Sequence, residues 1–145
     1  MSLFTAISIS ASGMEAQRTR AEIITENLAN ADTTRTPEGG PYKRKDAVFS
    51  TSSAAISFSD AMAGASIGLG EGVSVSQIVT DQSDPERRYL PGHPDADPDG
   101  YVAFPKINPA SEMVDLLGAS RGYEANVAAI SAAKDMIARS IDLFK

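Results

Sequence analysis

The stretch that decides the fold is "NPASEMVDLLGASRGYEANVAAISAAKDMIARSIDLFK", residues Asn108 to Lys145. Its first two residues are typical of a helix start, because asparagine caps free backbone N–H groups and proline fits the first helical position. Apolar positions then recur at alternating spacings of three and four, as in a coiled-coil seam. With two polar interruptions, these positions are Met113, Leu116, Ser120, Tyr123, Val127, Ile130, Lys134, Ile137, Ile141 and Phe144. We predict a C-terminal helical segment over residues 110–145.

A second, weaker amphipathic segment is predicted at the other end of the chain, over residues 1–36. Its apolar positions, again mostly three or four residues apart, are Leu3, Ile7, Ala11, Met14, Ala21, Ile24 and Leu28. This face is thin, since it contains two alanines and runs through a serine-rich stretch that ends at Gly13, so we expect a helix of low intrinsic stability. Asn27 and Asn30 suit its C-terminal end, because asparagine tolerates the left-handed conformation found there.

The middle of the chain, residues 37–109, holds all eight prolines. Because proline breaks helix interiors, the predicted class is α+β, with long terminal helices that pair as a coiled-coil-like layer and a small β-rich middle. Three stretches of the middle have strand character, namely residues 73–79, 86–90 and 101–104. Residues 50–72, dense in serine, alanine and glycine, are predicted to form a mobile loop.

The segment "HPDADPDG", residues His93 to Gly100, raises the question of a calcium loop. Counted from Asp95, the twelfth position should supply a chelating carboxylate, but it is Lys106. Proline also falls inside the loop, at Pro98 among others. We therefore interpret the segment as a turn between two strands, with Asp-Pro-Asp-Gly supplying the turn chemistry. A calcium-binding module at 95–106 remains the less favoured alternative.

Composition argues against most catalytic and nucleic-acid functions. The net charge is −6, whereas phosphate recognition needs a clustered positive face. The one basic run, Lys43 to Lys45, is short and is interpreted as a solvated or interface charge cluster. With no cysteine, and with His93 as the single histidine, neither a thiol nucleophile nor a multi-histidine metal site can form. We predict a protein that is not an enzyme and takes no cofactor.

The chain also lacks the usual marks of membrane insertion and secretion. No apolar stretch approaches the length that crosses a bilayer. The first seventeen residues contain no Lys or Arg, which a cleavable secretory signal would carry ahead of its apolar segment. If the protein leaves the cytoplasm, we expect it to do so without a conventional signal peptide.

The two amphipathic flanks predict self-assembly. A single pair of helices with a narrow seam buries little surface, and isolated helices are marginal in water. We therefore expect the flanks to be partly disordered in a lone chain and to order when neighbouring copies complete the seam. Open heterologous contacts would then give a helical filament or tube. The alternative is that the same apolar stripes form only an intramolecular core.

Three segments carry a family resemblance. They are "SLFTAISISASGMEAQRTRAEIITENLANADTTRTPEGGPYKRK", "PGHPDADPDGYVAFPKIN" and "EMVDLLGASRGYEANVAAISAAKDM". Together they resemble the bacterial flagellar basal-body rod proteins, and the length and the central segment are similar to the proximal members. The asparagine-threonine segment after the first helix and the Tyr123–Asn126 segment form a specific pair. Gly122 and Lys106 depart from the family pattern, where alanine and asparagine are expected.

The resemblance implies a structural subunit of the proximal rod, which crosses the periplasm. It implies export through the flagellar type III apparatus and polymerisation with copies of itself and other rod proteins, to transmit torque and enclose the export channel. It implies no nucleic acid and no membrane insertion. The terminal segments of that family pair around the channel, so the expected interface residues are Ile7, Met14, Ile24, Asn27, Leu28, Asn30, Met113, Leu116, Tyr123, Asn126, Val127, Ile130, Ile137 and Ile141. A secreted coiled-coil protein of adhesin type would share the same layout and is the alternative function.

Overall fold

The computed structural model describes residues 3–52 and 72–142. Two long helices form near the ends of the chain, and four short strands lie between them. In chain order the elements are α1 (Leu3–Ala29), β1 (Lys45–Ser52), β2 (Gly72–Thr80), β3 (Glu86–Tyr89), β4 (Tyr101–Phe104) and α3 (Pro109–Asp142). The α+β class with paired terminal helices is confirmed.

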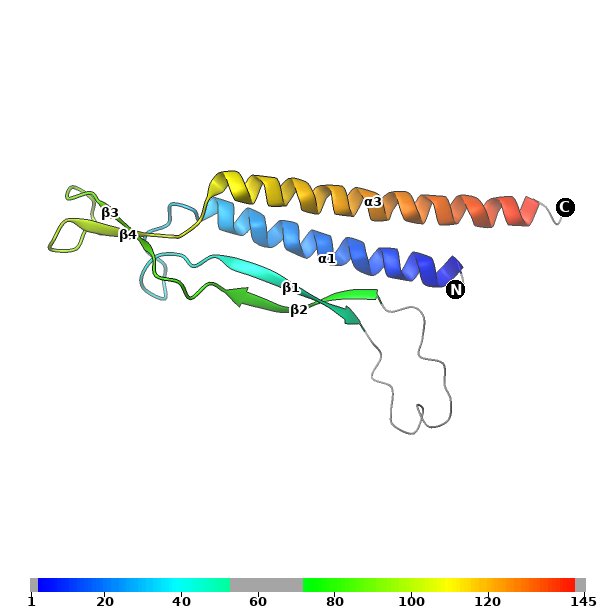
Figure 1. The fold of residues 1–145 in the computed structure, drawn as a ribbon, viewed down its shortest axis with the longest axis horizontal. Coiled ribbons are helices and arrows are strands. Elements are labelled where there is room, and N and C mark those ends of the chain that lie inside the picture. Colours follow the sequence, from blue (N-terminus) through cyan, green and yellow to red (C-terminus); the bar gives the residue numbers. More distant parts are fainter. Residues whose placement is uncertain (1–2, 53–71, 143–145) are drawn as a thin grey trace, which may run out of the picture.

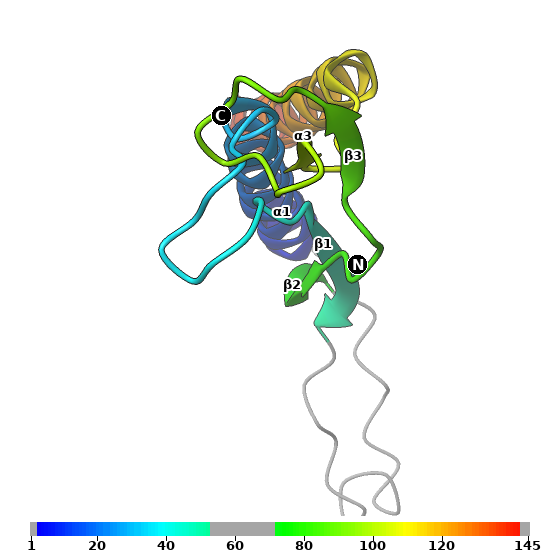
Figure 2. The same cartoon turned by 90° about the vertical axis from the view of Figure 1, so that its left-hand side faces the viewer.

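Helices α1 and α3 lie side by side and run in opposite directions, so that the end of α1 meets the start of α3 (Figure 1). The β1–β2 hairpin packs on the other side of α1, as the end-on view in Figure 2 shows. Among the described elements, α3 contacts neither strand of that hairpin. Helix α1 is therefore the central layer, and most of α3 faces outward.

The start of α3 forms as its sequence predicts. Asn108 Oδ1 accepts a hydrogen bond from the Ala110 N–H at 3.0 Å, and Pro109 is the first helical residue. The helix is 34 residues long and ends at Asp142 among the described residues. The prediction of continuous helix from this cap is confirmed over that range.

The end of α1 differs from the prediction in one respect. No non-glycine residue in the described part of the chain has a positive φ, so the left-handed ending proposed for Asn27 and Asn30 is wrong. Asn27 instead lies inside the helix and is fully buried. Asn30 closes the helix end through its own side chain, which donates to the Glu26 carbonyl at 2.9 Å.

The first hairpin contains a strand that the sequence patterns did not reveal. Strand β1 pairs antiparallel with β2, with a bulge between Val48 and Phe49. The predicted strand at 73–79 is confirmed as β2, but the predicted loop at 50–72 is too long, since residues 50–52 and Gly72 belong to strands. The rest of that loop, residues 53–71, lies outside the described residues.

The second hairpin, β3–β4, projects beyond the end of the helix pair where α1 ends and α3 begins (Figure 1). Both of its strands were predicted. The turn ahead of β4 is closed by a hydrogen bond from the Gly100 N–H to the Asp97 carbonyl at 2.8 Å. Gly100 has a φ of 82°, a conformation that glycine adopts without steric cost. The interpretation of the aspartate run as a turn is confirmed.

The buried apolar core of the described residues is small. Its members are Ala16, Ile23, Ile24, Val102, Phe104, Ala119 and Ala133. Three of the seven are alanines, so the helix pair buries little apolar surface along its length. None of the helices in the described part of the chain is long and apolar enough to cross a membrane.

Candidate functional site

The seam between α1 and α3 is built from small and polar residues. Three facing pairs run along it, namely Gly13–Asn126, Gln17–Gly122 and Asn27–Glu112. In each pair the two residue numbers have the same total, as a constant antiparallel register requires. The seam is therefore one continuous contact, although its side chains are not the large apolar ones of the predicted stripes.

Two glycines let the helices approach closely. A Cβ atom at Gly13 would lie 2.8 Å from Asn126 Oδ1, and one at Gly122 would lie 3.0 Å from Gln17 Cδ. Both distances are shorter than ordinary van der Waals contact. Glycine at 122, where the family pattern led us to expect alanine, thus has a structural reason. It makes room for the amide side chain of Gln17.

Asn27 connects the end of α1 to the chain ahead of β1. Its Oδ1 accepts hydrogen bonds from the Lys45 N–H at 2.9 Å and from the Tyr42 hydroxyl at 3.1 Å. Its Nδ2 donates to the Lys45 carbonyl at 2.7 Å and to Glu112 Oε2 at 3.4 Å. Every polar atom of this buried amide is therefore satisfied, and three segments distant in sequence meet at one side chain.

Glu112 and Arg44 form an ion pair beside that amide. The Glu112 side chain is only 2% exposed, and its Oε1 accepts from Arg44 Nε at 2.6 Å. Arg44 also lies 3.1 Å from Asp46 and 3.9 Å from Asp115. The hydrogen bond to Glu112 is the main reason that the pKa of Arg44 is raised. We call these contacts of Asn27, Tyr42, Arg44, Lys45 and Glu112 the junction.

Two of the three residues of the basic run, Lys43 to Lys45, form ion pairs within the chain. Arg44 and Lys45 pair with Glu112 and Glu26, respectively. Among the residues that the structure describes, Lys43 donates only to the neutral side chain of Gln82, at 3.2 Å. The interpretation of the run as a purely solvated or interface cluster is therefore wrong for Arg44 and Lys45, since both support the fold.

Burial also affects Tyr42, at the edge of the junction. It raises the pKa of this phenol to about 12, helped by the negative charge of Glu26. The hydroxyl therefore stays protonated and keeps its hydrogen bond to Asn27 over the physiological pH range.

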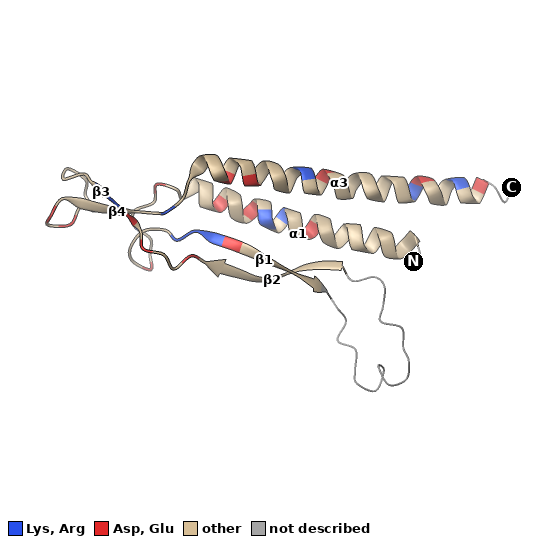
Figure 3. Cartoon of the chain, in the orientation of Figure 1, with Lys and Arg blue, Asp and Glu red and all other residues tan. Residues whose placement is uncertain are grey.

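Large apolar side chains flank the seam and remain partly open to solvent. A shallow groove runs between the helices where Gln17, Arg18 and Ala21 face Leu116 and Tyr123. Tyr123 and Val127 are each 42% exposed, and Ile141 is 56% exposed. Figure 3 shows that the first half of α1 and the middle of α3 carry no charge, which corresponds to residues 3–14 and 125–133. These two stretches lie opposite each other along the seam.

The aspartate loop does not gather ligands for a metal. Asp95 accepts a hydrogen bond from the Thr34 hydroxyl at 2.8 Å and lies 3.7 Å from Arg35. Asp97 lies 3.6 Å from Arg87. Within residues 3–52 and 72–142, no group of three or more acidic, histidine or cysteine side chains could hold a metal ion.

Comparison with known proteins identifies the family. The model for "Flagella basal body rod protein" matches residues 7–35, and the model for "Flagellar basal body rod FlgEFG protein C-terminal" matches residues 99–143. The flagellar basal-body rod protein FlgC of Bacillus subtilis is 41% identical, over 100% of each chain. FlgC of Borreliella burgdorferi is 37% identical over 100% of this chain and 99% of the relative, and FlgC of Salmonella typhimurium is 35% identical over 99% and 98%. The chain belongs to the FlgC family of flagellar basal-body rod proteins.

A rod protein of this family is a structural subunit of the flagellar basal-body rod. This agrees with the absence of a catalytic motif from the sequence. Membership of this family decides against the two alternative functions, the adhesin-type protein and the calcium-binding module. The residues that matter in such a protein are the ones that hold the helix pair together and those that it presents to neighbours.

The predicted interface residues of this rod protein occupy three environments. Ile24 and Asn27 are buried inside the chain. Met113, Tyr123, Val127 and Ile141 are exposed. The others are half-buried along the two helices, and these are Ile7, Met14, Leu28, Asn30, Leu116, Asn126, Ile130 and Ile137.

Sequence reasoning missed Gly13, Gln17, Arg44 and Glu112 as seam and junction residues. A signal was present, because Gly13, Gln17, Ile24 and Asn27 themselves follow a heptad spacing. This second heptad was hidden because most of its members are small or polar.

Proposed function

We propose that this rod subunit polymerises with copies of itself and with other rod proteins, and that the wall so formed transmits torque and encloses the export channel. Its family membership supports assembly with other rod proteins. We further propose that it crosses the periplasm as part of the proximal rod after export through the flagellar type III apparatus. Nothing in this role requires a cofactor, a nucleic acid or insertion into a membrane.

The observation that carries the proposal is the uncharged half of the helix pair. Residues 3–14 and 125–133 contain no charged side chain, and Phe4 within them is 77% exposed. Val127 on the facing helix is 42% exposed. An uncharged surface that exposes large apolar side chains is typical of an interaction site. Helices of neighbouring subunits would cover it.

The groove between the helices supports the same conclusion. Because the seam itself uses glycine, alanine and amides, the larger side chains beside it are free to pack against another helix. We propose as interface residues those expected from the family, namely Ile7, Met14, Ile24, Asn27, Leu28, Asn30, Met113, Leu116, Tyr123, Asn126, Val127, Ile130, Ile137 and Ile141. For the buried Ile24 and Asn27, the contribution would be indirect, through the position of the helix.

A charge placed on this surface tests the proposal. Val127→Asp should abolish swimming and rod assembly in a host that carries it as its sole copy, because a carboxylate would be buried against apolar neighbours. The matched control is Ala138→Asp, which is also exposed on α3 but lies outside the uncharged stretch and should leave swimming normal. Melting of the purified Val127→Asp chain should stay near that of the unmodified chain. Normal swimming by Val127→Asp, or by a strain lacking the gene, would refute the proposed role.

A further inference from the structure

The loop between β3 and β4, residues 90–100, is a preformed knob. The Leu90 N–H donates to the Gly100 carbonyl at 2.9 Å, and the Asp97 N–H donates to the Tyr101 carbonyl at 2.8 Å. The ring of Tyr89 lies against Gly100, where an added Cβ would be 2.8 Å from the Tyr89 Cε2 atom. The knob is therefore shaped by its own contacts, and a surface that is already ordered loses little entropy on binding.

The outer surface of the knob combines apolar and acidic side chains. Tyr89 is 64% exposed and Leu90 is 43% exposed. Asp95 is held by Thr34, which anchors the knob to the segment after α1. Asp99, also exposed, makes no hydrogen bond or ion pair with the described residues. An exposed aromatic residue is typical of protein interaction sites, and the carboxylate beside it can give charge complementarity with a partner.

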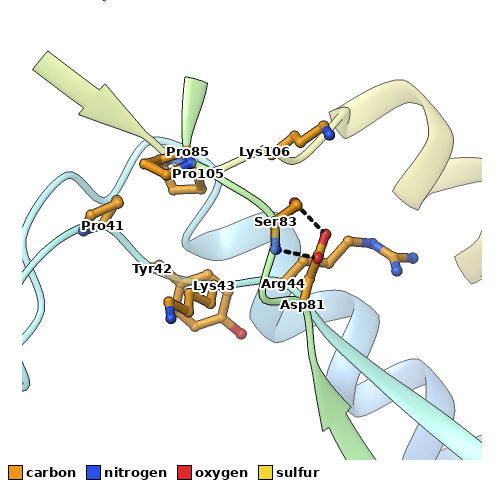
Figure 4. A pocket seen from close by; sticks show the side chains of 9 residues that line it. All are labelled: Pro41, Tyr42, Lys43, Arg44, Asp81, Ser83, Pro85, Pro105 and Lys106. Carbon is orange, nitrogen blue, oxygen red and sulfur yellow. Dashed lines mark hydrogen bonds between the residues drawn. The ribbon is translucent and has the colours of Figure 1, made fainter. Parts of the chain in front are cut away.

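A small hollow with the opposite charge lies at the base of the same hairpin, and we call it the socket (Figure 4). Its walls come from three connecting segments of the chain. The residues that line it are Pro41, Tyr42, Lys43, Arg44, Asp81, Ser83, Pro85, Pro105 and Lys106. The space inside, about 80 Å³, is far below that of ligand pockets, which hold roughly 300 Å³ or more. It suits a single side chain.

The charge of the socket is carried by two lysines. Arg44 is already paired with Glu112. Lys43 donates only to the neutral Gln82, and Lys106 forms no salt bridge with the described residues. Asp81 offsets part of this charge, because hydrogen bonds from Ser83 lower its pKa and keep it ionised. One carboxylate placed beside Lys106 would balance the charge that remains.

We propose that the knob of one copy inserts Asp99 into the socket of a second copy, beside Lys106. The complementary charges are the reason to choose a second copy as the occupant, since both halves of the contact occur on this chain. Tyr89 and Leu90 would then lie on the proline walls of the socket. Because knob and socket are different surfaces, each added copy leaves one of each free, which gives an open polymer. This contact rests on the proposed self-assembly and gives it a second, polar interface.

Reversing the charges tests the contact in a host whose only copy of the gene carries the change. Asp99→Lys and Lys106→Glu should each lower the yield of assembled rods about tenfold, as a loss of about 1.4 kcal/mol would. The double variant, in which every copy carries both changes, should recover most of the yield. Matching circular dichroism melts of the purified variants would show that folding is intact. Single variants with normal yields, or a double variant no better than either single one, would overturn the proposal.

Cross-linking separates this contact from self-assembly in general. The chain has no cysteine, so Pro98→Cys and Asp84→Cys, which are exposed and adjoin the contact without removing Asp99 or Lys106, can be introduced together and joined in rods with a short bismaleimide. A ladder of cross-linked copies is expected, whereas Glu22→Cys with Asp84→Cys should give none. Rods that assemble normally without the ladder would overturn the knob–socket contact and leave the proposed function standing. Failure of the unmodified chain to enter rods at all would overturn the proposed function as well.

Discussion

The close approach of the two helices can be tested at Gly13. A methyl group there would lie 2.8 Å from Asn126 Oδ1. Asn126 cannot easily turn away, because its Nδ2 donates to the Gly122 carbonyl at 2.8 Å. Gly13→Ala should therefore both break that hydrogen bond and push the helices apart.

The size of the effect follows from three contributions. Replacing a glycine inside a helix with alanine stabilises by about 1 kcal/mol. Overpacking costs about 1–3 kcal/mol, and the lost hydrogen bond costs about 1 kcal/mol. Gly13→Ala should therefore destabilise the chain by about 1–3 kcal/mol, measured by urea unfolding with far-UV circular dichroism.

Gly118 provides the matched control within the same helix pair. An added Cβ there meets nothing within 4 Å. Gly118→Ala should therefore only raise the free energy of unfolding, by about 1 kcal/mol, because alanine favours the helix more than glycine does. At about 2–4 °C per kcal/mol for a chain of this size, its melting temperature should rise while that of Gly13→Ala falls. Shortening the Asn126 side chain as well, in Gly13→Ala with Asn126→Ala, should recover part of the stability lost in Gly13→Ala. If Gly13→Ala were as stable as Gly118→Ala, the close packing of this seam would be refuted.

Three further predictions concern the junction and the helix ends. Glu112→Gln should destabilise the chain by about 2–3 kcal/mol in urea unfolding, because Arg44 loses its buried charged partner. Asp115→Asn should cost less than about 1 kcal/mol, because that pair is more exposed. Equal costs for the two variants would contradict a stabilising role of the buried Arg44–Glu112 pair. A spectrophotometric titration should show one phenol ionising with a pKa of about 12, above the ordinary 10, and Tyr42→Phe should remove it. Since the folded pKa is the higher one, the stability linked to Tyr42 is present below pH 10 and is lost as the pH rises towards 12. Amide exchange of the lone chain should be slowest near Ile24 and fast in the uncharged helix halves, and uniform strong protection would contradict coupled folding.

The period of both helices could be predicted from sequence, but the face that each turns to the other could not. The apolar heptad through Tyr123 and Val127 indicated a seam, and heptad spacing does occur along the contact. The contact itself is made by the residues one position earlier on α3, Gly122 and Asn126. Hydrophobicity identifies the helix face whose burial is favourable, but it does not distinguish burial inside one chain from burial between chains.

The junction shows a second limit of sequence reasoning. Any acidic residue near the start of a helix is favourable there, so the sequence position of Glu112 does not reveal that it is buried. Its burial depends on Arg44, which arrives from another segment 68 residues away. Strand β1 escaped prediction for a related reason. It begins with charged residues, which have low strand propensity. Its strand conformation is instead stabilised by pairing with β2.

The distribution of side-chain sizes explains why a weak helix pair suits a rod subunit. If Tyr123, Val127 and their neighbours filled the seam, the lone chain would gain apolar burial and stability. It would then have no large apolar side chains left for other subunits. With glycine and alanine in the seam, the helices come close together and the large residues stay on the flanks. The junction fixes the helix pair at one end through a buried ion pair, so the uncharged halves are already tethered at that end, which lowers the entropy cost of ordering them against a neighbouring helix.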